Sequence, residues 1–316
     1  MKQITFTLLV LISIGLVSCR KDKNDPDIKQ YDDIQIKNYI AANGITGMQR
    51  DTVTGDTSGI YYKIISPGTS TTPIQYSDIV SFVYTMRSLD GKYISTDSIN
   101  LNHYYGYAGH ISGSQLTSNP PLPKGLQKAV HDLVKYKGTS ARVIIPSHIG
   151  YGVNGYGLGS SSNANSHVGG NQSLDYYINV VSNQEVYDDN IIKNYIKTNS
   201  LTGYVKQPDG LYIKIATAGT GSDAISISSY YTVDYTAKFL NDTQFDNGAD
   251  VGFSNDGTSG SIPVTGVIEG LTGQTVGANV SLLVPSRFAY GQSGSSGTIG
   301  PNTVIRFDFT VKTVSN

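Results

Sequence analysis

Hydrophobic and polar residues alternate over the last strand-like stretch of the chain, residues 304–312. Its apolar members are Ile305, Phe307, Phe309 and Val311. Polar residues occupy the positions between them, and this period of two predicts an antiparallel strand with one buried face. The same alternation occurs earlier, at Leu174, Tyr176, Ile178 and Val180. We therefore expect strands over residues 174–180 and 304–312, and mainly strands in the chain around them.

Two other stretches have a helical period. Leu126, Ala129, Val130, Leu133 and Val134 form one apolar stripe at spacings i, i+3, i+4, i+7 and i+8. A second helix is predicted to begin with Asp32 or Asp33 as its N-cap and to end near Gly44, with Ile36, Tyr39 and Ile40 on one face. A helix this short is marginal alone, so it must dock on its domain. Strands with a short helix on their apolar face predict an α+β fold.

The chain contains an internal repeat. Residues 31–47 match residues 187–203 at 11 of 17 positions without a gap, at an offset of 156 residues. The match continues from 59–65 to 210–216 and from 145–152 to 284–291. Two units of this size indicate two domains rather than a solenoid. We expect a first domain over 31–183 and a second over 184–316, each opening with a short helix.

The N-terminal segment reads as a targeting signal. Met1 and Lys2 precede an apolar run from Ile4 to Leu16, which is short for a membrane span and typical of a secretory signal. Small residues then precede Cys19 and resemble a bacterial lipobox, which implies cleavage after residue 18 and lipidation of Cys19. The alternative is an ordinary signal peptide with an incidental cysteine. Residues 19–30 are predicted to be a flexible linker to a lipid anchor.

Composition and charge narrow the classes of function. The chain has 316 residues, and its 23 basic and 24 acidic residues give a formal net charge of −1. Electrostatic capture of nucleic acid needs a basic surplus or stripe, so nucleic acid is not an expected partner. The single cysteine excludes an intramolecular disulfide and a Cys-based zinc site. The five histidines lack paired-ligand spacing, and we expect neither a metal nor a cofactor.

Several short motifs follow one another in the second copy. They are Val233-Asp-Tyr-Thr-Ala-Lys-Phe-Leu, Gln244-Phe-Asp-Asn, Gly266-Val-Ile-Glu-Gly-Leu, Val276-Gly, Val284-Pro-Ser-Arg-Phe-Ala-Tyr-Gly and Ile299-Gly-Pro-Asn-Thr-Val-Ile-Arg-Phe. This ordered set covers nearly all of 208–314 and resembles FK506-binding-protein-type (FKBP) peptidyl-prolyl isomerases. The whole chain then resembles a tandem lipoprotein of this family from bacteria of the Bacteroidetes kind. The resemblance implies two twisted antiparallel sheets, each wrapped around a short helix.

The resemblance also implies a proline-binding site in the second copy. The residues that it places around the catalysed bond are Tyr235, Phe245, Asp246, Ile268, Tyr290 and Phe307, and those that it adds as substrate-binding walls are Val267, Leu271 and Ile299. In this family the Ile268 N–H and the Tyr290 hydroxyl would bind substrate carbonyls. Leu271 stands where many members carry Trp, and the segment between Gly270 and Gly277 is about four residues shorter than usual, so we expect a shortened central helix.

The first copy departs further from the family pattern. Its counterparts of the second-copy site are Tyr84, Tyr151, Val168 and Tyr176. However, Ile94-Ser95 replaces the Phe-Asp pair, and Leu122-Pro123 replaces Val-Ile. Proline has no N–H to donate to a substrate carbonyl. We therefore expect the first domain to be weak or inactive as an isomerase.

The resemblance predicts an isomerase that acts on proline-containing unfolded or nascent proteins of the cell envelope, where the lipid would hold the chain to a membrane. The rival hypothesis is a non-enzymatic FKBP-fold scaffold lipoprotein, favoured by Leu271 and the shortened helix. The patterns also allow plainer roles. Tyr235 and Phe307 could be ordinary core residues, and Asp246 precedes Asn-Gly and could be a turn residue.

Overall fold

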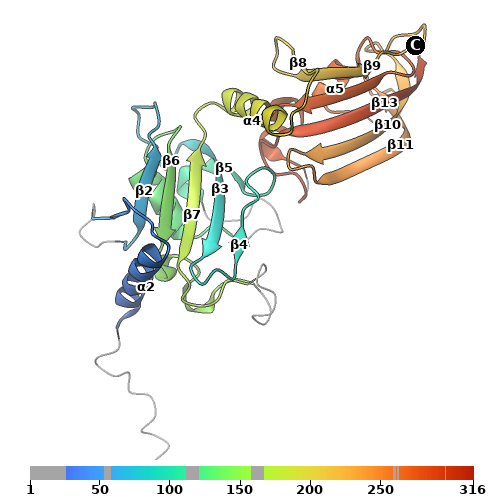
Figure 1. The fold of residues 1–316 in the computed structure, drawn as a ribbon. Coiled ribbons are helices and arrows are strands. Elements are labelled where there is room, and N and C mark those ends of the chain that lie inside the picture. Colours follow the sequence, from blue (N-terminus) through green and yellow to red (C-terminus); the bar gives the residue numbers. More distant parts are fainter. Residues whose placement is uncertain are drawn as a thin grey trace, which may run out of the picture.

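The computed structural model describes residues 26–52, 58–111, 121–157, 167–258, 261, 263–295 and 297–316. We refer to the residues up to 183 as the first half and to 184–316 as the second half. The expected signal peptide, Cys19 and residues 20–25 of the expected linker lie outside the described residues. Residues 28–30 belong to helix α2 (Ile28–Ala42), so the prediction of a flexible linker up to residue 30 is wrong for this part. Each half contains one antiparallel sheet, and Figure 1 shows the two sheets as separate bodies with helix α4 beside the second.

The two sheets have the same strand order. The first follows β1-β2-β6-β7-β3-β4, with β5 also paired to β3, and the second follows β8-β9-β12-β13-β10-β11. The first sheet is built from β1 (Gln49–Arg50), β2 (Tyr61–Ser66), β3 (Ile79–Ser88), β4 (Ile94–Ser95), β5 (His103–Tyr107), β6 (Ser140–Ile145) and β7 (Leu174–Val180). The second is built from β8 (Val205–Lys206), β9 (Tyr212–Thr217), β10 (Tyr230–Phe239), β11 (Gln244–Ser254), β12 (Asn279–Val284) and β13 (Ile305–Ser315). The predicted α+β class is confirmed.

The predicted alternation holds on the final strand of each sheet. Ile305, Phe307, Phe309 and Val311 on β13 are all buried, and Arg306, Asp308 and Thr310 between them are partly exposed. On β7 the predicted apolar residues are buried too, but Asp175 between them is also buried, at 2% exposure. Its carboxylate accepts two hydrogen bonds from Arg142, at 3.0 and 2.6 Å. A paired carboxylate can therefore occupy a position that alternation alone predicts to face solvent.

The first helix differs from its predicted start. Helix α2 (Ile28–Ala42) has Asp27 as its N-cap, and the Asp27 carboxylate accepts from the Gln30 N–H at 2.9 Å while the Gln30 side chain accepts from the Asp27 N–H at 3.2 Å. This capping box satisfies two of the free N–H groups of the first turn. The prediction that Asp32 or Asp33 caps the helix is therefore wrong, since both lie inside it. The predicted face is confirmed, because Ile36 is buried and Tyr39 and Ile40 pack beside it.

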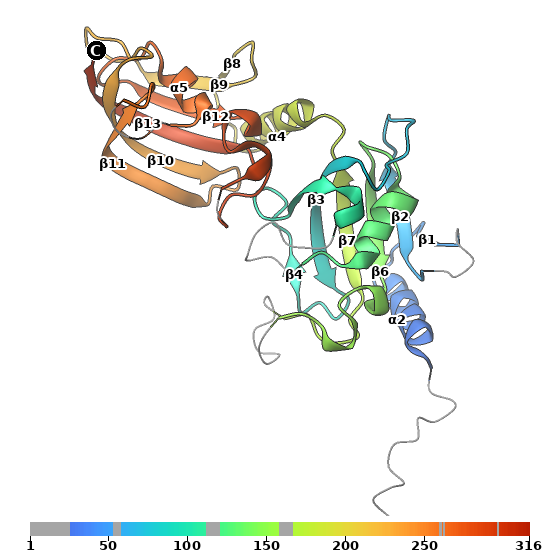
Figure 2. The same cartoon turned by 180° about the vertical axis from the view of Figure 1, so that it is seen from behind.

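A short helix lies on the apolar face of each sheet. In the first half, α3 (Lys124–Lys128) continues into π-helical turns over Ala129–Val134, and all five residues of the predicted apolar stripe are buried. In the second half, α5 (Thr265–Leu271) has seven residues. Figure 2 shows α5 in front of the second sheet.

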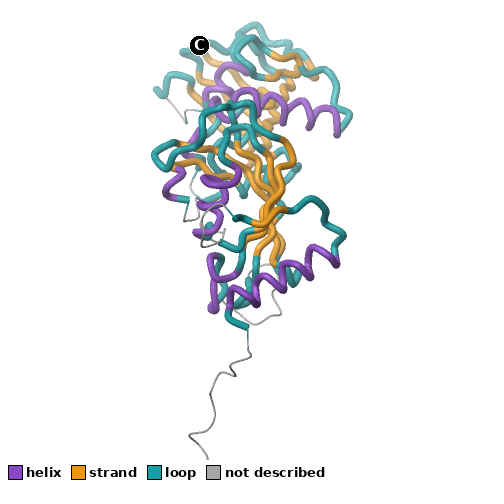
Figure 3. Tube along the Cα trace, turned by 90° about the vertical axis from the view of Figure 1, so that its left-hand side faces the viewer, coloured by secondary structure: helices purple, strands orange, loops and turns teal. Residues whose placement is uncertain are grey.

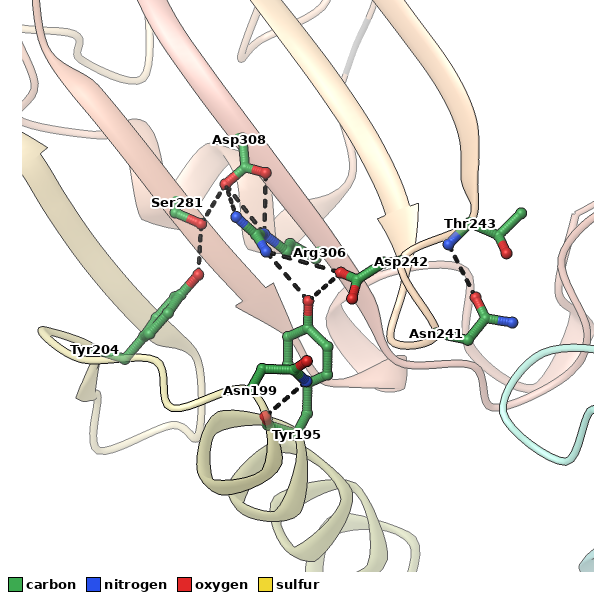
Figure 4. A network of polar contacts seen from close by, with 9 residues as sticks. All are labelled: Tyr195, Asn199, Tyr204, Asn241, Asp242, Thr243, Ser281, Arg306 and Asp308. Carbon is green, nitrogen blue, oxygen red and sulfur yellow. Dashed lines mark hydrogen bonds and ion pairs between the residues drawn. The ribbon is translucent and has the colours of Figure 1, made fainter.

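The opening helices α2 and α4 (Gln184–Thr198) lie at the other side of each sheet, and Figure 3 shows helices on both flanks of the strands. In the second half, Tyr195 of α4 donates to Asp242 at 2.5 Å and accepts from Arg306 at 3.1 Å. Arg306 also pairs with Asp308, and Figure 4 shows how these groups join the helix to the sheet. In the first half, Tyr39 of α2 donates to Asp175 at 2.8 Å. Each opening helix is thus an integral part of its half.

Candidate functional site

The polar edge of the candidate site is formed by the hairpin of β10 and β11. Tyr235 on β10 donates its hydroxyl hydrogen to Asp246 on β11, with 2.8 Å between the oxygens. Tyr235 is half-buried and Asp246 is exposed. Burial, followed by the hydrogen bond to and the charge of Asp246, raises the pKa of Tyr235 to about 12. Tyr235 therefore remains a hydrogen-bond donor over the whole physiological pH range.

The floor of the candidate site is apolar. Its members are Val267 and Leu271 of α5, Ile299 of the loop before β13, and Phe307 of β13, with exposures of 2%, 0%, 4% and 6%. Tyr235, Phe245 and Tyr290 pack against the same cluster as partly buried side chains. The Phe245 ring also lies 4.5 Å from the Phe239 ring, centroid to centroid. Three partly buried aromatic rings thus pack against an apolar cluster, and the Asp246 carboxylate is bound to one of them.

Tyr290 joins this group from another segment. It follows the 3-10 turn Ser286–Phe288 and precedes Gly291, which adopts a positive φ of 58°. Burial, and then the nearby Asp246 carboxylate, raise the pKa of Tyr290. Tyr290 packs against the same buried cluster as Tyr235, the partner of Asp246. Tyr290 also lines a cavity of about 740 Å³ that the second half forms with the first.

The Ile268 N–H is not a free donor in this structure. It donates to the carbonyl oxygen of Val264 at 3.2 Å, within the first turn of α5. The resemblance assigns this N–H to a substrate carbonyl, so a bound substrate would have to share or displace this long hydrogen bond. The Ile268 side chain is partly exposed, which leaves it available at the edge of the apolar floor.

A buried carboxylate that sequence reasoning did not select supports the Tyr290 segment. Asp188 of α4 accepts hydrogen bonds from the Ser286 N–H at 2.8 Å, from the Ser286 hydroxyl at 2.7 Å, and from the Gln184 amide at 2.8 Å. Burial raises the pKa of Asp188. The first half repeats the arrangement, because Asp32 accepts from Ser147 at 2.7 Å and from the His148 N–H at 3.2 Å. In the sequence, the Tyr-Asp-Asp motif that opens both copies could have indicated that Asp32 and Asp188 have the same structural role.

The first-half counterparts occupy the equivalent places but leave no hollow. Tyr84, Val168 and Tyr176 are buried, at 6%, 0% and 0% exposure. Tyr151 donates across the space to the Pro121 carbonyl oxygen at 2.9 Å. The described residues around this point, including Tyr84, Leu122 and Tyr151, leave no volume for a water molecule. Pro123 is the N-cap of α3, the position that Val264 holds before α5. The Leu126 N–H donates to Pro123 as the Val267 N–H donates to Val264. The prediction that Leu122-Pro123 replaces Val267-Ile268 is therefore wrong, and Pro123 is not the counterpart of Ile268.

The described part of the chain shows neither a metal-ligand cluster nor a membrane-spanning helix. No group of three or more His, Cys, Asp and Glu side chains there is placed to hold one metal ion. None of the described helices is long and apolar enough to cross a bilayer.

Comparison with known proteins points to one family for the second half. Residues 222–312 match the family model of FKBP-type peptidyl-prolyl cis-trans isomerases. Peptidyl-prolyl cis-trans isomerase Mip of Coxiella burnetii is 33% identical over 103 residues, which cover 31% of this chain and 42% of the relative. Outer membrane protein MIP of Legionella longbeachae is 34% identical over 112 residues, which cover 34% of this chain and 46% of the relative. The chain thus spans less than half the length of these two relatives.

Solved structures of this family are also similar. FkpA from Escherichia coli is 28% identical, with a TM-score of 0.35, over 40% of this chain and 58% of that one. The three FKBP domains of wheat FKBP73 are 19% identical, with a TM-score of 0.32, over 85% of this chain and 99% of that one. The second half is thus similar to FKBP-type isomerases over residues 222–312.

Proposed function

We propose that the protein is a peptidyl-prolyl cis-trans isomerase whose activity resides in its second half. The observation that carries this proposal is the Tyr235–Asp246 pair beside Tyr290, above the apolar floor of Val267, Leu271, Ile299 and Phe307. Phe245, Val267, Ile268, Leu271 and Phe307 would enclose the prolyl ring. Apolar and aromatic side chains beside polar groups support a role in lowering the barrier to rotation about an amide bond.

The chemistry needs no covalent step. Rotation about an X–Pro bond faces a barrier of about 18–20 kcal/mol, because twisting destroys amide resonance. The twisted amide has less charge separation than the planar one, so a dry aromatic pocket favours it relative to water. An acceleration of about 10⁴ requires about 5.5 kcal/mol of differential stabilisation. Tyr290 would hold a substrate carbonyl, and Asp246 with Tyr235 would polarise the pocket as the amide turns.

We assign the first half, over residues 31–183, a role other than turnover. Ile94-Ser95 stands in place of Phe245-Asp246, and the described residues around Tyr84, Leu122 and Tyr151 leave no volume for a water molecule. The second half, over 184–316, would carry the isomerase. The clients would be unfolded or nascent proteins with exposed prolines.

The proposed location is the cell envelope. The apolar run before Cys19 and the lone cysteine support a lipid-anchored chain, and one relative is named an outer membrane protein. Metabolic labelling with a fatty acid, in the wild type and in Cys19→Ser, tests the anchor. Incorporation into the wild type alone is expected, and equal labelling of the two would contradict it.

A non-enzymatic FKBP-fold scaffold is the second candidate. The seven-residue α5, Leu271 at the floor and the engaged Ile268 N–H favour it. A protease-coupled prolyl isomerisation assay on the full chain separates the two. We expect acceleration by the wild type and a clear loss of it in Asp246→Ala and Phe245→Ala. The matched first-half variant Ile94→Ala changes an exposed side chain and should be as active as the wild type. An inactive wild type that still binds unfolded protein would establish the scaffold instead.

A further inference from the structure

We propose that the first half positions the candidate active site of the second half, through a clasp on the loop that carries Ile299. This inference rests on the proposed function, because it assigns a task to the half that we expect to lack turnover. The clasp consists of the 96–103 segment of the first half, held against residues 299–304 of the second half.

Polar contacts form the centre of the clasp. The Nδ1 atom of His103 lies 2.8 Å from the carbonyl oxygen of Pro301, and His103 is buried at 8% exposure. The Asn302 amide also donates to the Ser81 hydroxyl at 3.4 Å. The backbones approach closely at Gly300, where an added Cβ would lie 2.4 Å from the Asn100 carbonyl oxygen. Only glycine fits this position without displacing the loop.

An apolar contact lies beside the polar ones. Ile99 of the first half packs against a buried cluster of the second half that includes Leu240 and Val304. The space left between His103, Ile99 and this cluster is a cavity of about 10 Å³, which is about the minimum for one water molecule. The two halves are therefore closely packed at this point.

The clasped loop is tied directly to the candidate site. Ile299 is part of its apolar floor, and Ile299 exchanges backbone hydrogen bonds with Ser295, at 2.9 and 3.0 Å. The Asn302 N–H donates to the Gly291 carbonyl oxygen at 2.8 Å. Gly291 directly follows Tyr290. A displacement of Pro301 or Asn302 would therefore move both the floor and the tyrosine that would bind a substrate carbonyl.

The first half contains the same loop without such a clasp among the described residues. Val168 pairs with Tyr156 as Ile299 pairs with Ser295, and the Asn171 N–H donates to Gly152 at 2.8 Å. Asn171 and Asn302 share the same left-handed backbone, with φ of 56° and 55°. At Gly169, the counterpart of Gly300, the nearest described atom to an added Cβ is Gln172 Cγ at 3.5 Å. Gly169 therefore provides an internal control.

The 96–103 segment lies where the first half has a break between two strands, whereas the second half has one continuous strand. In the second half, β11 runs without a break from Gln244 to Ser254. In the first half, β4 ends at Ser95 and β5 begins at His103. Asp97 organises the intervening loop, since its carboxylate accepts from the N–H groups of Ile99 at 3.2 Å and Asn100 at 3.0 Å. The loop is thus shaped by its own residues to meet the second half.

The test compares Gly300→Ala with Gly169→Ala in the full chain. Neither glycine has a left-handed φ, so alanine strains neither backbone, and the two variants differ in the clash with Asn100. Hydrogen exchange of peptides covering 299–304 reports on the clasp, and kcat/KM for a prolyl peptide reports on the site. We expect Gly300→Ala to speed this exchange and to lower kcat/KM, each by about tenfold. We expect Gly169→Ala to change neither.

His103→Ala provides an independent disruption, with His148→Ala as its control. His148 is bound to Asp32 at 2.7 Å within the first half, so its loss weakens that half without touching the clasp. We expect His103→Ala to act like Gly300→Ala, and the double variant to lose little more than either single variant, because both break one contact surface.

Each outcome decides the inference. Unchanged exchange at 299–304 in both Gly300→Ala and His103→Ala would overturn the clasp. Faster exchange with unchanged kcat/KM would overturn its role in positioning the site. A wild-type chain without isomerase activity would overturn the proposed function and the positioning of catalysis with it, whereas the exchange measurement would still decide whether the clasp exists.

Discussion

The Tyr235 hydroxyl and the Asp246 carboxylate are hydrogen-bonded across the β10–β11 hairpin at 2.8 Å. The hydrogen bond fixes the orientation of an exposed carboxylate beside the apolar floor. Without it, the Asp246 side chain would sample several rotamers in solvent. Asp246 can therefore act on a substrate at a fixed place. The pair links the sheet geometry to the proposed chemistry.

Removal of the Tyr235 hydroxyl tests this pair. Tyr235→Phe keeps the ring and frees Asp246, so we expect kcat/KM to fall about three- to tenfold, the range that corresponds to one hydrogen bond. The thermal unfolding midpoint should change little, because the hydroxyl bonds an exposed group. The matched change in the first half, Tyr84→Phe, should leave kcat/KM unaltered. Equal kcat/KM in the wild type and Tyr235→Phe would remove this pair from the mechanism.

Replacement of Asp188 tests the support of the Tyr290 segment. In Asp188→Asn an amide group replaces the carboxylate. If its NH₂ faces Ser286, the Ser286 donors lose their acceptor, and an unsatisfied buried donor costs about 1–3 kcal/mol. We expect lower stability of the second half, measured by denaturant unfolding, together with a lower kcat/KM. Asp32→Asn makes the same change in the first half and should destabilise that half while retaining most of the activity. Full activity and stability in Asp188→Asn would show that Ser286 does not need the carboxylate.

The buried His103 predicts a pH-dependent contact between the halves. Burial lowers the pKa of His103 below its ordinary value of 6.5, although carbonyl oxygens and the nearby Asp97 partly oppose this. Tyr187 of α4 also faces the small cavity beside the ring. The packed state therefore favours neutral His103, so its contribution to stability is present above pH 6.5 and is lost as the pH falls through the lowered pKa. Exchange at 299–304, corrected for its intrinsic pH dependence, should rise on acidification.

The variant His103→Gln provides the control for this pH dependence, because glutamine can donate to a carbonyl oxygen without titrating. We expect its exchange at 299–304 to be insensitive to pH between about 7 and 5. A wild-type chain with the same flat profile would rule out His103 as the titrating group.

Restoring the missing pair in the first half should not create a second isomerase. We expect Ile94→Phe/Ser95→Asp, placed in a chain inactivated by Asp246→Ala, to remain inactive. Tyr151 still donates to the Pro121 carbonyl oxygen, and the described residues around it leave no volume for a water molecule. Recovery of isomerase activity in this variant would show that the first half lacks only the Phe-Asp pair.

Local patterns predicted the elements of the fold, and long-range contacts accounted for what they missed. The alternation on β13 and the stripe at Leu126–Val134 each follow from one segment and its burial. Asp32 looked like a cap because its role depends on Ser147, a partner 115 residues away in sequence. The true cap, Asp27, lay in a charged stretch that resembled a linker.

The candidate site shows the same division. Tyr235 and Asp246 come together through one hairpin, so the motif order was sufficient to expect them in one place. The hydrogen bond that engages the Ile268 N–H depends on the exact start of α5, which residue spacing does not fix. The contact of His103 with Pro301 joins residues 198 positions apart, and nothing in either local sequence indicates it.

A prolyl isomerisation assay on the full chain tests the central claim most directly. The account predicts faster cis-to-trans conversion of an X–Pro peptide by the wild type, a strong reduction in Asp246→Ala, and wild-type rates in Ile94→Ala. A wild-type rate equal to the uncatalysed rate, or an Asp246→Ala variant as fast as the wild type, would contradict it.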